Sequence, residues 1–323
     1  MRFGVLSTAN IGVNVVIPAI KEAGHEVRAI ASREKQRAKS VGSKLDIPQT
    51  YGSYTKLLEN ETIDAIYNPL PNALHAKWTK KAADNGLHVL CEKPLTVDAE
   101  EAREVASYCN ERDVTLMEAF MWRYHPRTKR AKEITTEYFD DIRSVKATFQ
   151  FPVTDPDNIR LQPELGGGSL MDVGCYAMNA TRLFLGEPIE VYATTTDRRD
   201  TGVDTELTAI LEYPDGATAQ ISSNFDTPEK QSYRIEATNG WLEVEEAFAV
   251  RSDRVSLTYH VNGRTVNEEF ESTNQYRLEI EEFVSAITED RDPETGPSEA
   301  IANMELIDAL YESANKERPI TVT

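Results

Sequence analysis

Short apolar segments alternate with helical patterns through roughly the first 120 residues of the chain. The apolar segments lie at residues 3–7, 27–31, 63–67, 88–91 and 114–117, with a shorter one near Thr50. Segments of this length, separated by helices, predict βα units whose parallel strands are buried on both faces. We therefore expect an α/β domain with a parallel sheet over residues 1–122.

After residue 122 the pattern changes to short strands. They are expected at residues 143–151, 189–197, 204–213, 217–225, 231–238, 241–247, 255–261 and 264–270. Asp215-Gly216, Asn239-Gly240 and Asn262-Gly263 are strong hairpin signals, so the sheet should be large, open and mainly antiparallel. Helices at 275–288 and 297–314 and an edge strand near 319–322 complete an α+β domain over residues 123–323.

The chain is strongly acidic, with 54 Asp and Glu against 35 Lys and Arg and a formal net charge of −19. This charge disfavours binding to nucleic-acid phosphates or to anionic lipid. Because the acidic residues are spread along the chain rather than gathered in a tail, they indicate a carboxylate-rich surface. We hypothesise a salt-adapted, halophilic protein; a moderately acidic mesophilic enzyme is the alternative.

The cysteines Cys91, Cys109 and Cys175 show no metal-ligand spacing, so no metal site is expected. Buried free thiols in a reducing compartment are the simplest interpretation. The chain enters its first strand at once, which leaves no room for a signal peptide. No apolar run approaches the ~20 residues of a membrane-spanning helix. These features predict a cytoplasmic protein without a membrane partner.

The segment from Val89 to Pro94 is a buried strand that ends abruptly at Glu92-Lys93-Pro94. Proline ends the run and favours an extended residue before it. Lys93 is therefore expected at the carboxyl end of a parallel strand, where open α/β sheets bind their ligands. The alternative is that Lys93 is a loop cation paired with Glu92.

The first strand runs into Ser7-Thr8-Ala9-Asn10-Ile11-Gly12, and a second strand follows about 20 residues later. This is the spacing of a dinucleotide-binding Rossmann unit, although only Gly12 remains of its glycine fingerprint. Small residues still allow close approach of a pyrophosphate, and a helix N-terminus favours an anion. Residues 7 to 11 are therefore candidate cofactor-binding residues.

The second strand ends in Ser32-Arg33, with Arg37 close behind, where an NAD site would place an acidic residue. A hydroxyl and guanidinium groups suit a 2′-phosphate, so we expect NADP(H) in preference to NAD(H). A solvated, basic helix start is the alternative.

The strand at 63–67 continues into a rigid loop of sequence Asn-Pro-Leu-Pro-Asn at residues 68–72. Pro69, Leu70 and Asn72 are placed to cover the nicotinamide ribose, and Asn72 is expected to cap the helix that follows. His75 lies one turn into that helix as a further cofactor candidate. A structural role for His75, bonding loop backbone, is equally compatible with its position.

The chain resembles the glucose–fructose oxidoreductase, inositol dehydrogenase and rhizopine-catabolism family of NAD(P)-dependent oxidoreductases over nearly its whole length. The motifs that carry the resemblance are residues 69–72 with His75, residues 91–94, and Gly-Gly-Gly-Ser-Leu-Met-Asp-Val-Gly-Cys-Tyr at 166–176. Tyr176, where many members carry His, together with residues 119–126 and 158–160, resembles the sugar dehydrogenase and dimeric dihydrodiol dehydrogenase branch. Ser7 and Ala9 depart from the family's fingerprint.

The resemblance implies that Lys93, Asp172 and Tyr176 meet near the nicotinamide. A tyrosinate is a competent base only if its ordinary pKa of ~10 is lowered, and an adjacent ammonium does this. Tyr176 would be the acid/base, Lys93 its electrostatic partner and a candidate co-base, and Asp172 the residue that orients Lys93 or a sugar hydroxyl. The structural alternative for Tyr176 is a half-buried aromatic side chain on a helix. The structural alternative for Asp172 is a helix N-cap.

The remaining candidates fall into two groups. Those expected to bind cofactor are Glu92, Lys93, Trp122 and Arg123. Those expected to bind substrate are Lys93, Arg123, His125, Asn158, Arg160, Asp172 and Tyr176. The resemblance also implies a homodimer or homotetramer formed through the second domain's sheet.

The expected function is NADP-dependent oxidation of an aldose, of the D-xylose or D-glucose type, at C1 to a lactone. A trans-dihydrodiol or dicarbonyl oxidoreductase is the second enzyme hypothesis, which an apolar substrate pocket would favour. A non-catalytic NADP(H)-sensing protein is a third, but a sensor needs none of Lys93, Asp172 and Tyr176.

Overall fold

The computed structural model describes residues 1–271 and 273–322, and it divides into two compact units. Unit 1 comprises Met1–Met121 and Asn274–Met304, and unit 2 comprises Trp122–Thr273 and Glu305–Thr323. The first division lies beside the expected boundary at residue 122. Residues 274–304, which were expected in the second domain, instead group with the first. The reason is packing at long sequence separation: the rings of Phe3 and Phe283 lie 6.1 Å apart.

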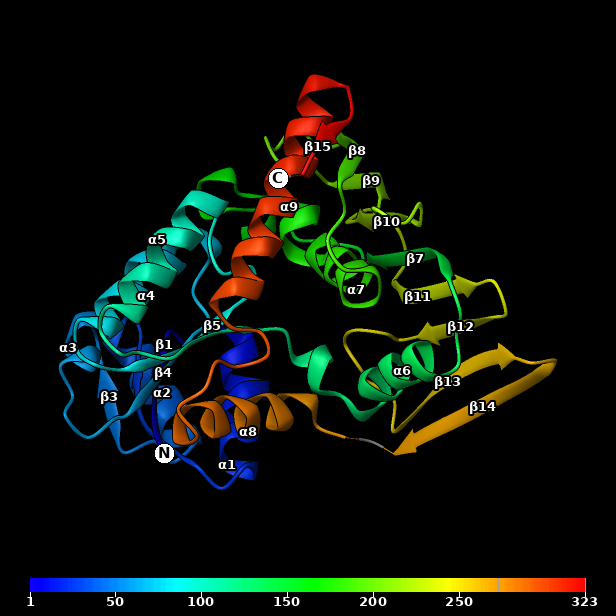
Figure 1. The fold of residues 1–323 in the computed structure, drawn as a ribbon. Helices are drawn as coiled ribbons and strands as arrows, with labels where there is room; N and C mark the ends of the chain where they lie inside the picture. The colour runs from blue at the N-terminus through cyan, green and yellow to red at the C-terminus, as the bar shows by residue number, and fades with distance from the viewer. Residues whose placement is uncertain (272, 323) are drawn as a thin grey trace. The chain divides into compact units, whose positions relative to one another are not determined.

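Unit 1 is built on a parallel sheet with strand order β3-β2-β1-β4-β5-β6 (Figure 1). Its strands are β1 (Arg2–Leu6), β2 (Glu26–Ala31), β3 (Gln49–Tyr51), β4 (Ala65–Asn68), β5 (His88–Glu92) and β6 (Leu116–Ala119). The expected α/β class is therefore confirmed. The order reverses between β1 and β4, so the loops after these two strands diverge at the carboxyl edge of the sheet.

The helices of unit 1 follow the expected βα alternation. They are the π-helix η1 (Gly12–Val16), α1 (Ile17–Glu22), α2 (Lys35–Lys44), α3 (Tyr54–Leu58), the 3₁₀-helix η2 (Asn72–Leu74), α4 (His75–Ala83), α5 (Ala99–Asn110) and α8 (Gln275–Thr288), with the start of α9 (Pro297–Lys316). Pro18 lies in the first turn of α1, where its missing N–H costs no helical hydrogen bond, and the regular helix begins only after the π-helix η1. Asn72 does not cap α4: Pro71 is the N-cap of η2, and Asn72 is its first residue.

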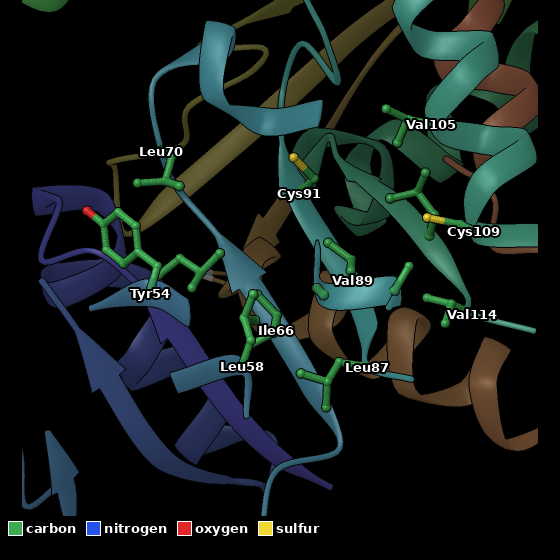
Figure 2. Close-up of a cluster of buried hydrophobic side chains, with 14 of the residues drawn as sticks. Tyr54, Leu58, Ile66, Leu70, Leu87, Val89, Cys91, Val105, Cys109 and Val114 are labelled. Carbon is green, nitrogen blue, oxygen red and sulfur yellow. The ribbon is translucent and has the colours of Figure 1, made fainter. Parts of the chain in front are cut away.

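One buried cluster of unit 1 joins the sheet to α3, α4 and α5 (Figure 2). Leu57 and Leu58 of α3, Val89 of β5 and Val105 of α5 are members, each almost without exposed surface. Figure 2 also shows the thiols of Cys91 and Cys109 within this cluster, and both are free cysteines. Burial raises the pKa of the Cys109 thiol to about 12, so it stays protonated and inert.

Unit 2 is built on a mixed, mainly antiparallel sheet with strand order β14-β13-β12-β11-β7-β10-β9-β8-β15 (Figure 1). Its strands are β7 (Ile142–Gln150), β8 (Glu190–Thr196), β9 (Glu206–Glu212), β10 (Thr218–Asn224), β11 (Lys230–Ala237), β12 (Gly240–Glu245), β13 (Arg254–Val261), β14 (Arg264–Glu271) and β15 (Ile320–Thr321). The exception to antiparallel pairing is β7 beside β10. These strands lie far apart in the chain and need no hairpin.

Buried and exposed residues alternate along the strands of unit 2, so the sheet has one covered and one open face. Val145, Ala147 and Phe149 of β7 are buried, and β7 packs against helix α7 (Cys175–Leu185). The other helices are α6 (Pro126–Glu137), the 3₁₀-helices η3 (Met121–Tyr124), η4 (Ile159–Leu161) and η5 (Pro163–Leu165), and the π-helix η6 (Leu170–Gly174).

Among the described residues, no helix is long and apolar enough to cross a membrane. Across the same part of the chain, His, Cys, Asp and Glu form no group of three or more suited to holding a metal ion.

Candidate functional site

The carboxyl ends of β1 and β4 form the ligand-binding edge of unit 1. The turn after β1 reaches Gly12, where an added Cβ would lie 3.4 Å from the ring of Tyr67 and 3.5 Å from Pro69. These are ordinary van der Waals distances, so the helix start packs against β4 and its loop at normal contact.

Ser7 takes the place of the first fingerprint glycine and adopts a glycine-like backbone, with φ 87°. Its amide donates to the carbonyl of Ala31 at 3.0 Å, and its hydroxyl accepts from the amide of Ala9 at 3.0 Å. The hydroxyl bond compensates in part for the strain of a positive φ in a non-glycine residue. Ser7, Thr8 and Ala9 thus form a tight turn at the expected pyrophosphate position, leading to Asn10 and Ile11.

The end of β2 carries a compact cationic group. Ser32 is buried, and its hydroxyl accepts from the amide of Glu34 at 3.2 Å, while Arg33 and Arg37 are exposed. Burial raises the pKa of Tyr54, and the positive charges of the two guanidinium groups oppose that rise. Sequence reasoning missed Tyr54, because nothing in its helical pattern connects it with the end of β2.

Trp78 of α4 extends this group. Its ring meets Tyr54 edge-on at 5.0 Å between centroids, and the ammonium of Lys81 lies 5.0 Å from its centre. Cation–π contact holds Lys81 here in spite of the acidic balance of the chain. Beside the buried Ser32 hydroxyl, the exposed Arg33 and Arg37 favour an anionic ligand.

Two hydrogen-bond networks hold the loop that carries Lys93. Before it, Glu92 accepts from the hydroxyl of Tyr67 at 2.6 Å. After it, the amide of Leu95 donates to Glu118 Oε1 at 2.8 Å. The Lys93–Pro94 peptide between them is cis, and the Lys93 side chain is half-buried.

Glu118 is fully buried at the end of β6, and its hydrogen bonds join β6 to residues close to the C-terminal end of unit 1. Its Oε2 accepts from Asn303 at 2.9 Å, and its backbone carbonyl accepts from the hydroxyl of Thr295 at 2.6 Å. Buried carboxylates are stable only when hydrogen-bonded in this way. Glu118 was not among the predicted residues, because both partners lie more than 170 residues away in the chain.

His75 is fully buried and joins two loops. Its Nδ1 lies 2.9 Å from the carbonyl of Pro94, and its Nε2 lies 2.6 Å from the carbonyl of Leu70. Burial lowers the pKa of His75 to about 4, so the ring is neutral at physiological pH. This arrangement is the structural alternative named above, since a ring with no exposed surface positions Leu70 and Lys93 rather than contacting a ligand.

In unit 2, Asp172 forms an ion pair with Arg160, in which Nε donates to Oδ2 at 2.6 Å. The Asn158 side chain caps η4 by accepting from the amide of Arg160 at 3.1 Å. Three predicted substrate residues are therefore brought together. Asp172 lies within η6 rather than at a helix cap, which removes that structural alternative.

Tyr176 follows at the start of α7 and is 5% exposed. Its ring packs against Phe149 and Phe248, at 5.5 and 5.6 Å between centroids. Trp122 has no exposed surface and meets Phe248 edge-on at 5.3 Å. Trp122 thus occupies the apolar interior of unit 2, although a cofactor contact was expected of it.

Arg123 and His125 are also held inside unit 2. Arg123 is 8% exposed and donates to Asn179 Oδ1 at 3.4 Å. His125 is 1% exposed and caps α6, with Nδ1 accepting from the amide of Arg127 at 3.0 Å. His125 thus caps α6 from the interior of unit 2, and its contact with a substrate stays a prediction.

Replacing His125 by Asn is expected to flatten the pH dependence of stability. Burial lowers the pKa of His125 to about 4, so the folded state resists a proton that the unfolded chain accepts at about 6.5. Stability from this group is complete above about pH 6.5 and is lost as pH falls toward 4. Asn retains the cap but does not titrate. The loss in unfolding free energy between about pH 7.5 and 5 should be about 1–2 kcal/mol smaller in the variant.

Urea denaturation at both pH values measures this difference. An unchanged pH dependence in His125→Asn would contradict the buried neutral histidine. A selective rise in substrate KM would instead restore His125 to the substrate site.

The predicted catalytic residues are divided between the units, with Lys93 in unit 1 and both Asp172 and Tyr176 in unit 2. Each unit therefore holds part of the predicted catalytic set. The meeting of Lys93 with Tyr176 stays a prediction.

Two family domains match the chain in order. Residues 1–120 match the family described as "Oxidoreductase family, NAD-binding Rossmann fold", and residues 129–243 match the "GFO/IDH/MocA C-terminal domain". Together with the parallel sheet and its ligand-binding edge, these matches define an oxidoreductase with a dinucleotide-binding domain.

Known proteins similar to the chain cover almost all of its length. D-xylose 1-dehydrogenase (NADP(+)) 2 of Haloferax volcanii is 52% identical over 316 residues, which is 97% of each chain. The crystal structure of a 3-ketoreductase from Actinomadura kijaniata, in complex with NADP and TDP-benzene, is similar with a TM-score of 0.91 and 30% identity over 97% of each chain. An aldose-aldose oxidoreductase from Caulobacter crescentus superimposes with a TM-score of 0.93 and 26% identity over 99% of each chain.

The chain belongs to the GFO/IDH/MocA family of oxidoreductases. The family expected from the sequence motifs is thereby confirmed.

Proposed function

We propose that the chain is an NADP-dependent sugar dehydrogenase that oxidises an aldose, of the D-xylose or D-glucose type, at C1 to a lactone. The observation that carries the proposal is the 52% identity, over 97% of both chains, with a relative named as an NADP-dependent D-xylose 1-dehydrogenase. Retention of Lys93, Asp172 and Tyr176 supports a catalytic role over cofactor sensing.

The residues of unit 1 fit NADP. The tight turn of Ser7 to Ala9 before a helix start suits a pyrophosphate, and Ser32 with Arg33 and Arg37 suits a 2′-phosphate. Pro69, Leu70 and Asn72 would cover the nicotinamide ribose.

In this mechanism, a bound nicotinamide supplies the acceptor for the hydride that leaves C1. Tyr176, as tyrosinate, accepts the proton of the C1 hydroxyl, so that a carbonyl forms as the C–H bond breaks. Lys93 provides the positive charge that makes tyrosinate accessible at neutral pH. Asp172 orients Lys93 or a sugar hydroxyl, and its pairing with Arg160 fixes the direction of its carboxylate.

The test is NADPH formation across a panel of aldoses, polyols and trans-dihydrodiols, with NAD and NADP, at low and molar salt. Turnover of one pentose or hexose with NADP is expected. Turnover of diols alone would favour the dihydrodiol enzyme. Tight NADP binding without turnover would favour the sensor.

A second copy of this chain is the proposed protein partner, and the cytosol the proposed compartment. The open face of the unit 2 sheet supports the first proposal, because it exposes two large apolar side chains. Tyr192 of β8 and Ile210 of β9 lie opposite each other and are 41% and 47% exposed. Exposed apolar patches of this kind mark protein interfaces.

Replacing Ile210 by Glu is expected to convert the oligomer to a smaller species. A buried, unpaired carboxylate at an interface costs several kcal/mol, on the order of the loss measured when a buried charge is left unpaired. Light scattering coupled to gel filtration measures the mass. Tyr138, which is 43% exposed at the end of α6, provides the control Tyr138→Glu. A monomeric parent protein, or an Ile210→Glu oligomer of unchanged mass, would contradict the proposed interface.

Molar salt is expected to stabilise the protein. Repulsion within a chain of net charge −19 is screened over a Debye length of roughly 3 Å at 1 M salt, against roughly 10 Å at 0.1 M. Urea denaturation in low and molar KCl should show a higher unfolding free energy in molar salt. Equal stability in both solutions would remove the salt-adapted interpretation.

A further inference from the structure

The carboxylate of Asp204 is a buried anchor inside unit 2. It lies just before β9 and is 8% exposed. Its Oδ2 accepts from the hydroxyl of Ser169 at 2.7 Å and from the amide of Leu170 at 2.8 Å. Its Oδ1 accepts from the hydroxyl of Tyr311 at 2.7 Å. Three donors on one buried carboxylate make it a strongly defined point in the structure.

The groups that Asp204 holds begin the segment that carries the predicted chemistry. Ser169 is the N-cap of η6, Leu170 is its first residue, and Asp172 follows two residues later. The backbone of Asp204 adds a fourth bond, since its carbonyl accepts from the amide of Ser169 at 2.8 Å. Asp204, which lies just before β9, thus bonds the start of η6, and α7 with Tyr176 in its first turn follows after Gly174. The Ser169 hydroxyl also lies 2.8 Å from the hydroxyl of Ser223.

The glycines before Ser169 show how closely this anchor is packed. An added Cβ at Gly168, where φ is +124°, would lie 2.4 Å from Asp204 Oδ1. An added Cβ at Gly167 would lie 2.5 Å from the carbonyl of Arg160. The loop is thus clamped between Asp204 and the backbone of Arg160, whose guanidinium pairs with Asp172. Asp204, the loop at residues 167–169 and the ion pair between Arg160 and Asp172 are therefore linked by a continuous set of contacts.

We propose that Asp204 is a positioning residue for the reaction: it anchors the first turn of η6 and so holds Asp172 and Tyr176 in working geometry. This inference rests on the proposed function. The side chain makes no contact with the reacting atoms in this role. It acts through the amide of Leu170 and the hydroxyl of Ser169.

The test is a cycle of Asp204→Ala and Tyr176→Phe, with kcat expressed per folded enzyme. Misplacing a catalytic group by about 1 Å costs about 10²-fold, so Asp204→Ala should lower kcat by about 10–100-fold. In the Tyr176→Phe background the same change should lower the residual kcat by less than about threefold, because the group it positions is gone. A merely structural role would lower kcat by the same factor in the parent enzyme and in the Tyr176→Phe variant.

Asp197 provides a matched control in the same unit. Its carboxylate also accepts from loop amides, those of Arg199 at 3.0 Å and Gly202 at 2.8 Å, but this loop carries no predicted site residue. Asp197→Ala should change kcat by less than about threefold. Asp204→Asn should recover part of the loss, because its amide oxygen can face Leu170 while its amino group faces Tyr311.

The positioning role would be overturned if Asp204→Ala lowered kcat by the same factor with and without the Tyr176 hydroxyl. It would also be overturned if the Asp204→Ala enzyme kept the kcat of the parent. If Asp204→Ala does not fold, Ser169→Ala replaces it in the cycle with the same two outcomes. Failure of the proposed function is distinguishable, because the parent protein would then show no aldose turnover, whereas failure of the positioning role leaves the parent turnover intact.

Discussion

Replacing Tyr176 by Phe is expected to lower kcat by about 10²–10⁴-fold, the usual contribution of a positioned acid/base. Phe retains the packing of the ring against Phe149 and Phe248, so only the hydroxyl is lost. Without it, no side chain is assigned to remove the C1 hydroxyl proton as hydride leaves. Initial rates with saturating sugar and NADP measure the effect.

NADPH binding, followed by fluorescence, should stay within about twofold of the parent, because Tyr176 lies outside unit 1. Tyr233→Phe is the matched control: Tyr233 is 1% exposed in unit 2, and its hydroxyl has no hydrogen-bond partner among the described residues. This control should keep the parent kcat. Undiminished turnover in Tyr176→Phe would exclude Tyr176 from the mechanism.

Replacing Arg33 by Ala is expected to weaken NADP(H) binding by about 10–100-fold, the equivalent of about 1.5–3 kcal/mol for a hydrogen bond to a charged group. NAD(H) lacks the 2′-phosphate, so its affinity should change by less than about threefold. Titration calorimetry with both cofactors measures the ratio, and it requires no turnover.

Lys39 is the control for this change, because it is an exposed cation on α2, the helix that follows Arg33. Lys39→Ala should leave both affinities within about twofold, since a distant surface charge is screened. Equal losses for NADP(H) and NAD(H) in Arg33→Ala would overturn the assignment of the 2′-phosphate.

Most strands and helices of both units could be predicted from local sequence. The period of the apolar residues and the turn signals are local properties, and they place α8 at the residues expected for it. The residues at strand ends were predictable for the same reason, because the carboxyl edge of a parallel sheet is a general binding position. Lys93, Ser32 and Arg33 all lie at such ends.

Contacts between distant segments were not predictable. No local pattern links Tyr54 with Arg33, or Asp204 with Ser169, because their proximity exists only after the chain has folded. The same limit applies to the roles of His75 and His125. Their sequence positions suggested ligand contacts and, for His75, a structural role, but not the particular backbone partners that the folded chain gives each ring.

The discontinuous composition of unit 1 has a consequence for how the protein is made. Ribosomes add about 5–20 residues per second and domains tend to fold as they emerge. Phe283, Thr295 and Asn303 reach the N-terminal sheet only after all of residues 122–273 have been synthesised. Until then Phe3 and Glu118 lack these partners. Unit 1 can therefore complete its folding only after its C-terminal segment has been synthesised. A gene fragment ending at residue 121 is a poor source of an isolated NADP-binding domain.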